Sequence, residues 1–151
     1  MGTIVVGVDG SAASKAALRW ALDDAKARGA SRVLAVMAWS YPMMPASPFV
    51  GAVPPIPVDE IEAATTARLA ETIAEVCTDA DVAAGVTVDT QVECGSAATL
   101  LIEASKSADE VVVGTRGLGG FTGLMLGSVS HQVAMHAGCP VVIVPDPERG
   151  H

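Results

Sequence analysis

The chain has 151 residues and a formal net charge of −8, and half of its residues are hydrophobic but only 3% are aromatic. This length predicts one domain over residues 1–151, with a core of Ala, Val, Leu and Ile. The nine Lys and Arg residues form no run, which argues against nucleic acid as a partner. No apolar run approaches the ~18 residues that a membrane span needs.

The start of the chain and its cysteines indicate the cellular compartment. The sequence enters the apolar run 3–6 directly, without the basic segment or cleavage site of a signal peptide, so we expect a cytoplasmic protein. Cys77, Cys94 and Cys139 are widely spaced and form no C-x-x-C pair. This spacing favours reduced, buried thiols over a zinc site or a redox pair.

The first third of the chain predicts a strand, a helix and a second strand. Residues 4–8 form a Val-rich run that ends at the turn sequence Asp9-Gly10-Ser11. Ser11 can cap a helix that begins near Ala12, and Gly29 is a suitable residue to end it. The apolar run 33–39 predicts the second strand, so that the three elements form a right-handed crossover.

A proline-rich segment and a long helix follow. Residues 40–57 contain six of the nine prolines, which excludes a helix or a central strand and predicts a long exposed loop. Asp59 and Glu62 resemble a capping box at the start of a helix. Helical spacing predicts its buried stripe as Ile61, Thr65, Leu69, Ile73 and Val76.

The last part of the chain repeats the alternation. Val86, Val88 and Val92 predict a third strand that ends at Cys94-Gly95, and Ser96 can cap a short helix. Residues 111–113 predict a fourth strand before a glycine-rich loop. Helical spacing resumes at Val129, Val133 and His136 and stops at Gly138, and residues 140–145 predict a final strand bounded by prolines.

Five strands alternating with four helices predict a doubly wound α/β fold with a parallel sheet and helices on both faces. By analogy with small folds of this class we expect the strand order 3-2-1-4-5. Ligands of such sheets bind beyond the carboxyl ends of the strands, where the winding reverses. With this order, the reversal brings the turn at Asp9 next to the glycine-rich loop.

The spacing of the loop glycines excludes the two commonest phosphate loops. The chain contains no Gly-Lys dipeptide, as a P-loop requires, and Thr122 occupies the place of the third glycine of a G-x-G-x-x-G motif. The pattern that fits is G-x-x-G, nine residues, and then G-S, formed by Gly114, Gly117, Gly127 and Ser128. Glycines bring main-chain N–H groups close to a ligand, and the following helix adds a positive dipole end, so the pattern predicts a phosphate site.

Several side chains around this loop have two possible roles each. Ser128 and Ser130 can donate hydroxyl hydrogen bonds to phosphate, and Ser128 can also cap the helix. Asp9 either accepts hydrogen bonds from ribose or adenine, or simply caps its turn. Arg116 either reaches a β- or γ-phosphate or is solvated, and Trp39 either stacks on a base or closes the edge of the core.

The sequence contains no motif for catalysis or for metal binding that is as specific as the glycine pattern. His131 and His136 are five residues apart, so they do not share a helix face as paired metal ligands do. No G-x-S-x-G elbow or other nucleophile–base pair is present. We therefore predict no catalytic residue and no metal site in the protein itself.

The same motifs resemble the ATP-binding branch of the universal stress protein family, from end to end of the chain. The resemblance is carried by Val8-Asp9-Gly10-Ser11, by the strand end at Met37-Ala38-Trp39, by the glycine pattern with Ser128-Val129-Ser130, and by the closing 139–144. It implies ATP, with Mg²⁺, or a related adenine nucleotide. The residues that it implies as ligands are Asp9, the main chain near Ala38, Gly114, Gly117, Gly127, Ser128, Val129 and Ser130.

The resemblance also implies a regulatory role in the stress response and a homodimer through the last strand, Val141–Val144. That strand would otherwise be an exposed hydrophobic sheet edge. Two alternatives remain open: an interaction module of the same fold that is empty or binds cyclic AMP, and an enzyme that hydrolyses ATP slowly. The protein partner and the role of residues 40–57 are not indicated by the sequence.

Overall fold

The computed structural model describes residues 2–30, 32–41, 57–78, 82–115 and 126–148. Strands and helices alternate along the chain, as predicted. The strands are β1 (Thr3–Gly7), β2 (Arg32–Trp39), β3 (Thr87–Cys94), β4 (Glu110–Gly114) and β5 (Val141–Val144). The helices are α1 (Ala12–Arg28), α2 (Val58–Val76), α3 (Ala97–Ser105) and α4 (Ser128–His136).

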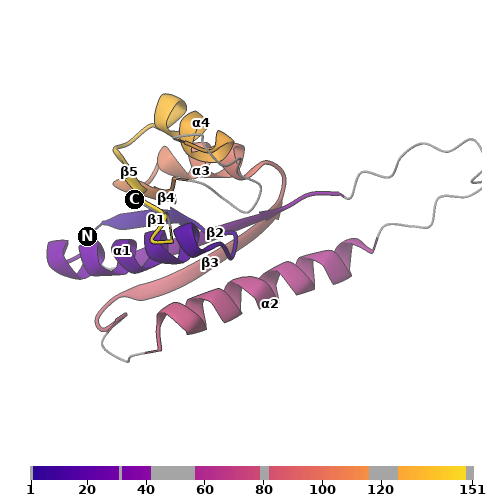
Figure 1. Ribbon diagram of the computed structural model, residues 1–151, viewed down its shortest axis with the longest axis horizontal. Coiled ribbons are helices and arrows are strands. Elements are labelled where there is room, and N and C mark those ends of the chain that lie inside the picture. Colours follow the sequence, from indigo (N-terminus) through magenta and orange to yellow (C-terminus); the bar gives the residue numbers. More distant parts are fainter. Residues whose placement is uncertain (1, 31, 42–56, 79–81, 116–125, 149–151) are drawn as a thin grey trace, which may run out of the picture.

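The five strands form one parallel sheet with the order β3-β2-β1-β4-β5, which confirms the predicted topology. Helices α1 and α2 lie on one face of the sheet and α3 and α4 on the other (Figure 1). The Val-rich strands are buried from both faces: Val6, in the central strand, pairs with Ala35 of β2 and Val112 of β4. The residues between α1, α2 and the sheet form one hydrophobic cluster, and those under α3 and α4 form a second.

Helix α1 begins and ends at the predicted residues. The Ser11 hydroxyl accepts a hydrogen bond from the Ser14 N–H at 3.2 Å, which satisfies one free donor of the first turn. Gly29 ends the helix with φ +69°, a left-handed conformation that glycine adopts at low cost. Ser96 caps α3 in the same way as Ser11 caps α1.

Helix α2 differs from the prediction at its start and in its buried stripe. Pro57 occupies the cap position and no side chain caps the helix, so the predicted capping box of Asp59 and Glu62 is wrong. Asp59 instead lies in the first turn, where a carboxylate favours the helix dipole without a capping bond. The buried residues are Thr65, Leu69, Thr72 and Val76.

Ile61 and Ile73 of α2 are only half-buried, although the spacing placed them in the stripe. Thr72 is buried because its hydroxyl donates to the Arg68 carbonyl at 2.9 Å, so its polar atom enters the core with a partner. Helix α4 shows a similar difference, because its buried residues are Ser130 and Val133 while Val129 is 38% exposed. No helix among the described residues is long and apolar enough to cross a membrane.

A buried carboxyl group lies at the start of β4, at the sheet edge opposite the strand ends considered below. Glu110 is 2% exposed, and its Oε2 lies 3.0 Å from Nη2 of Arg28 in the last turn of α1. Arg28 also forms an ion pair with Asp24, whose Oδ2 lies 3.0 Å from Arg28 Nε. Burial and the negative charge of Asp24 raise the pKa of Glu110, and the Arg28 charge opposes them.

Replacing Glu110 by Gln tests this account. A raised pKa means that the folded state keeps a proton that the unfolded chain has already lost, so the stability contributed by Glu110 falls as pH rises above its ordinary pKa of about 4.3. Gln does not titrate. We therefore expect the free energy of unfolding of Glu110→Gln, relative to the parent, to increase as pH rises above about 4.3, until the folded parent has also lost the proton, as measured in urea titrations.

The matched control is Glu103→Gln. Glu103 forms an exposed i,i+3 ion pair with Lys106 on α3, and ion pairs of this kind contribute little to stability. Its stability profile should follow that of the parent. Parallel profiles for the parent and Glu110→Gln would contradict the predicted direction.

Candidate functional site

The winding of the sheet reverses between β1 and β4. The two strands are neighbours in parallel, so their carboxyl ends lie at the same sheet edge. The chain leaves β1 toward α1 on one face and leaves β4 toward α4 on the other face (Figure 1). The connections diverge here, and a crevice at such a point is the usual ligand site of a doubly wound sheet.

The turn after β1 holds Asp9 through local hydrogen bonds. Its Oδ1 accepts from the Ser11 N–H at 2.9 Å, and its own N–H donates to the Ser14 hydroxyl at 3.2 Å. Gly10 has φ +86°, which a side chain would make costly. The turn-capping role of Asp9 is therefore present in the structure, and its contact with a ligand stays a prediction.

Arg68 of α2 also contacts this turn, although no local sequence pattern predicts that contact. Its Nη2 donates to the Asp9 carbonyl at 3.2 Å. The two residues are 59 positions apart and come from different elements, so only the packing of α2 against the sheet brings them together.

Gly114, at the end of β4, lies against the first turn of α1. A Cβ at this position would lie 2.8 Å from the Cβ of Ala13 and 2.9 Å from its main-chain carbon. Since backbone cannot move aside as a flexible side chain can, glycine is needed for this approach. The first motif glycine therefore joins the β4 end closely to the start of α1.

Thr115 follows Gly114 and its main chain joins three elements. Its N–H donates to the Val144 carbonyl of β5 at 3.0 Å, and its carbonyl accepts from the Gly127 N–H at 2.6 Å and from the Ser130 hydroxyl at 3.0 Å. Its own Oγ1 is buried, and within the described part of the chain it has no hydrogen-bond partner. A buried hydroxyl without a partner is costly, which makes it a candidate contact for a ligand.

The N-terminus of α4 offers main-chain donors at the same edge. Gly127 is the cap residue and no side-chain cap is present, so Ser128 is the first helical residue and not the cap. Helix geometry leaves the N–H groups of Ser128, Val129 and Ser130 without a carbonyl of the preceding turn. These donors and the helix dipole favour an anion.

The side chains of this first turn differ in what they offer. The Ser128 side chain is exposed, and its Oγ accepts from Gln132 Nε2 at 3.4 Å. The Ser130 hydroxyl is directed to the carbonyls of Thr115 and Gly127, at 3.0 and 3.1 Å. A hydroxyl has one proton, so in this arrangement Ser130 offers a ligand its main-chain N–H.

The end of β2 contributes Ala38 and Trp39 to the same sheet edge. Ala38 is half-buried and lies two residues beyond Val36, which pairs with Gly7 of β1. Trp39 is 8% exposed, and its ring meets Tyr41 edge-on at a centroid distance of 5.5 Å. This burial agrees with the alternative in which Trp39 closes the edge of the core. Arg116 and Gly117 lie outside the described residues.

The described part of this edge holds no group suited to metal binding. The described residues contain no cluster of three or more His, Cys, Asp or Glu that could hold a metal ion. Burial raises the pKa of the Cys77 and Cys139 thiols, which reduces their reactivity. Cys94, predicted as buried, is exposed because it ends β3 at the edge of the sheet.

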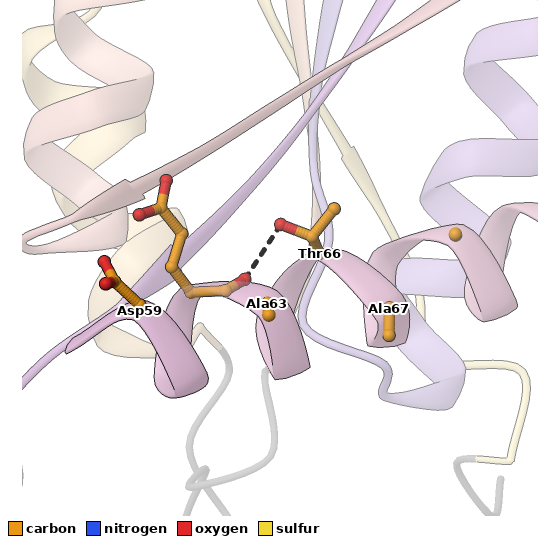
Figure 2. A pocket seen from close by; sticks show the side chains of 6 residues that line it. Asp59, Ala63, Thr66 and Ala67 are labelled. Carbon is orange, nitrogen blue, oxygen red and sulfur yellow. Dashed lines mark hydrogen bonds between the residues drawn. The ribbon is translucent and has the colours of Figure 1, made fainter. Parts of the chain in front are cut away.

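A separate groove of about 530 Å³ lies along the outer face of α2. Figure 2 shows Asp59, Ala63, Thr66 and Ala67 on this face, and Thr66 Oγ1 donates to the Glu62 carbonyl at 2.8 Å. All of its lining residues belong to α2, so it is distinct from the crevice at the ends of β1 and β4. It offers small apolar side chains and two carboxylates but no phosphate-binding group.

Comparison with known proteins identifies the family of the chain. A model of the universal stress protein family matches residues 1–145. A universal stress protein from Mycolicibacterium smegmatis is 41% identical over 146 residues, which cover 93% of this chain and 45% of that protein. This chain spans less than half of the length of the curated relatives that it matches.

Two solved structures share this fold. Universal stress protein UspA from Lactobacillus plantarum has a TM-score of 0.73 at 23% identity, with 95% of this chain and 97% of that chain covered. A universal stress protein in complex with cAMP has a TM-score of 0.58 at 27% identity, with 96% and 97% covered. The chain belongs to the universal stress protein family.

Proposed function

We propose that this protein is a regulatory universal stress protein that binds an adenine nucleotide, and that ATP is the nucleotide. The observation that carries the proposal is the uncapped N-terminus of α4 beside the close approach of Gly114 to Ala13. A helix start without a side-chain cap, at the switch point of a doubly wound sheet, is suited to a phosphate group. The solved relative with bound cAMP supports an adenine nucleotide as the ligand class.

The chemistry of the described residues fits such a ligand. The buried Thr115 hydroxyl lacks a partner among them, and a nucleotide oxygen would supply one. The first-turn N–H groups of α4 can bind phosphate without a basic patch, which suits a chain of net charge −8. Asp9 would accept hydrogen bonds from the ribose hydroxyls, because a carboxylate next to phosphate would be repelled.

The remaining ligand contacts rest on the family resemblance. The main chain near Ala38 would contact the adenine, since it lies at the end of β2 beside β1. Gly114, Gly117, Gly127, Ser128, Val129 and Ser130 would surround the phosphates, with Arg116 and Mg²⁺ neutralising part of their charge. Residues 1–151 would act as one domain, in which nucleotide occupancy regulates the binding of a protein partner.

The nucleotide can be tested by thermal unfolding with and without Mg-ATP. Binding to the folded state must raise stability by mass action, by about 2.7 kcal/mol at a hundredfold excess over Kd. Ser128→Asp places a negative charge in the first turn of α4, where it repels phosphate but favours the helix dipole by roughly 0.3–1 kcal/mol. We therefore expect this variant to be at least as stable as the parent without ATP and to lose the stabilisation by ATP.

Thr99→Asp is the matched control, because Thr99 is an exposed residue in the first turn of α3. It adds the same charge at a different helix start and should keep the full response to ATP. An equal response of the parent and Ser128→Asp would contradict phosphate binding at α4.

A cyclic nucleotide is the second candidate, favoured by the cAMP complex of the relative. The same assay with cAMP separates the two. Stabilisation by cAMP without stabilisation by ATP would make the protein a cyclic-nucleotide-binding module, since the two ligands share adenine and ribose but differ in phosphate charge and length.

We also propose that the protein forms a homodimer through β5. This strand lies at the edge of the sheet, and all four of its residues, Val141–Val144, are half-buried in the single chain. An apolar edge strand is prone to pair with another strand, and a two-fold axis would pair two copies of β5 antiparallel.

Ile143→Pro tests the dimer. In a parallel ladder the N–H and the carbonyl of one residue point to the same side, and successive residues alternate between the two sides. The carbonyls of Pro140 and Val144 accept hydrogen bonds from the β4 side. Ile143 therefore points its N–H to the open edge. Proline removes that donor. We expect the parent to sediment at twice its 15.2 kDa chain mass and the variant to sediment as a monomer. A monomeric parent would contradict the proposal, and circular dichroism confirms that the variant folds.

A further inference from the structure

We propose that Arg68 is a positioning residue of the nucleotide site and that it couples nucleotide binding to helix α2. This inference rests on the proposed function. Its starting observation is the hydrogen bond from Arg68 Nη2 to the Asp9 carbonyl, at 3.2 Å. The same Nη2 would lie 3.6 Å from a Cβ placed on Gly10, so the guanidinium covers the turn that follows β1.

The charge of Arg68 has no carboxylate partner among the described residues. Lys15, Arg28, Arg32 and Lys106 all form ion pairs with Asp or Glu. Arg68 forms none with the described residues, although the chain carries a net charge of −8, and its guanidinium donates to a main-chain carbonyl. The Arg68 side chain is exposed, and its contact with the turn comes from the hydrogen bond to the Asp9 carbonyl and from the position of α2.

This hydrogen bond orients the peptide group between Asp9 and Gly10. Two further contacts of the turn are local: the Ser11 N–H donates to the Asp9 carboxylate, and the Asp9 N–H donates to the Ser14 hydroxyl. Gly10, with φ +86°, has no side chain that restricts the peptide group. Arg68 supplies a contact from outside the turn. By holding the Asp9 carbonyl it helps to keep Gly10 and Ser11 in place, and the Ser11 N–H in turn holds the Asp9 carboxylate.

Helix α2 packs into the core on either side of Arg68. Leu69, the next residue, is fully buried, and Thr65 and Thr72 are buried one turn to either side. The Arg68 carbonyl accepts the Thr72 hydroxyl at 2.9 Å. A ligand that fixes the Asp9 turn thereby favours the bound position of α2, and by linkage a docked α2 favours ligand binding to the same extent.

Calorimetric titration of adenosine, AMP and Mg-ATP into Arg68→Met tests the assignment. Met keeps an unbranched stem and a good helix propensity but has no donor. We expect affinity to fall by about five- to tenfold, the lower part of the usual range for coupled sites. The factor should be the same for all three ligands, because a residue that acts through the turn does not sense the number of phosphates. Arg68→Lys keeps a positively charged donor group and should restore most of the affinity.

Arg19→Met is the matched control, because Arg19 is an exposed arginine of α1 with no ion pair among the described residues. It removes the same charge from the same face of the sheet and should leave all three affinities unchanged. Hydrogen exchange gives a second readout: nucleotide should slow the exchange of the α2 amides near Leu69 in the parent and not in Arg68→Met.

The outcomes separate this inference from the proposed function. A parent that binds none of the three ligands overturns both. A parent that binds, together with an Arg68→Met variant that binds equally well, overturns only the role of Arg68. A loss of affinity that grows from adenosine to ATP also overturns it, because it would show direct contact with the phosphates. The absence of any nucleotide effect on α2 exchange in the parent overturns the coupling.

Discussion

At the centre of the sheet, β1 pairs in parallel with β4, and the pairs Ile4 with Glu110 and Val6 with Val112 fix their register. About a hundred residues separate the two strands, so closing this contact orders most of the chain between them, at a cost in entropy that rises slowly with loop length. Because the strands are parallel, the pairing brings the Asp9 turn and Gly114 to the same edge. Every other feature of the candidate site depends on that register.

Main-chain hydrogen bonding then determines how the site is built. Thr115 uses its N–H for β5 and its carbonyl for the start of α4, so one residue connects the sheet edge to the helix. Each of these groups would be costly if it were buried without a partner. The buried hydroxyl of Thr115 has no hydrogen-bond partner among the described residues. It is therefore the polar atom of this residue that a ligand could contact.

The fold could be read from the sequence wherever the signal is local. The caps at Ser11, Gly29 and Ser96 depend on residues within one turn of the helix ends. The alternation of strands and helices predicts the parallel sheet, and the analogy with small folds of this class predicts its strand order. The start of α2 was wrong because Pro57 occupies the cap position, and a proline has neither the side-chain acceptor nor the main-chain N–H that a capping box needs. The stripe of α4 was wrong because a hydroxyl with two carbonyl acceptors can be buried as readily as a valine.

The candidate site was predictable in part for the same reason. The glycine pattern and the Asp9 turn are short sequence motifs, and the topology brings Gly114, Gly127 and Asp9 to one edge. The contact from Arg68 and the burial of Glu110 against Arg28 join residues that are far apart in the chain. Such contacts depend on the packing of whole helices, and no local pattern encodes them.

The exposure of Cys94 makes one thiol chemically distinct. Cys94 ends β3 in contact with solvent, whereas Cys77 and Cys139 are partly buried and burial raises the pKa of both thiols. At neutral pH a maleimide or iodoacetamide reagent will therefore react first at Cys94. Because β3 is an outer strand whose carboxyl end lies at the same sheet edge as the crevice, a single dye there would be a fluorescent reporter of events at that edge, without a new cysteine.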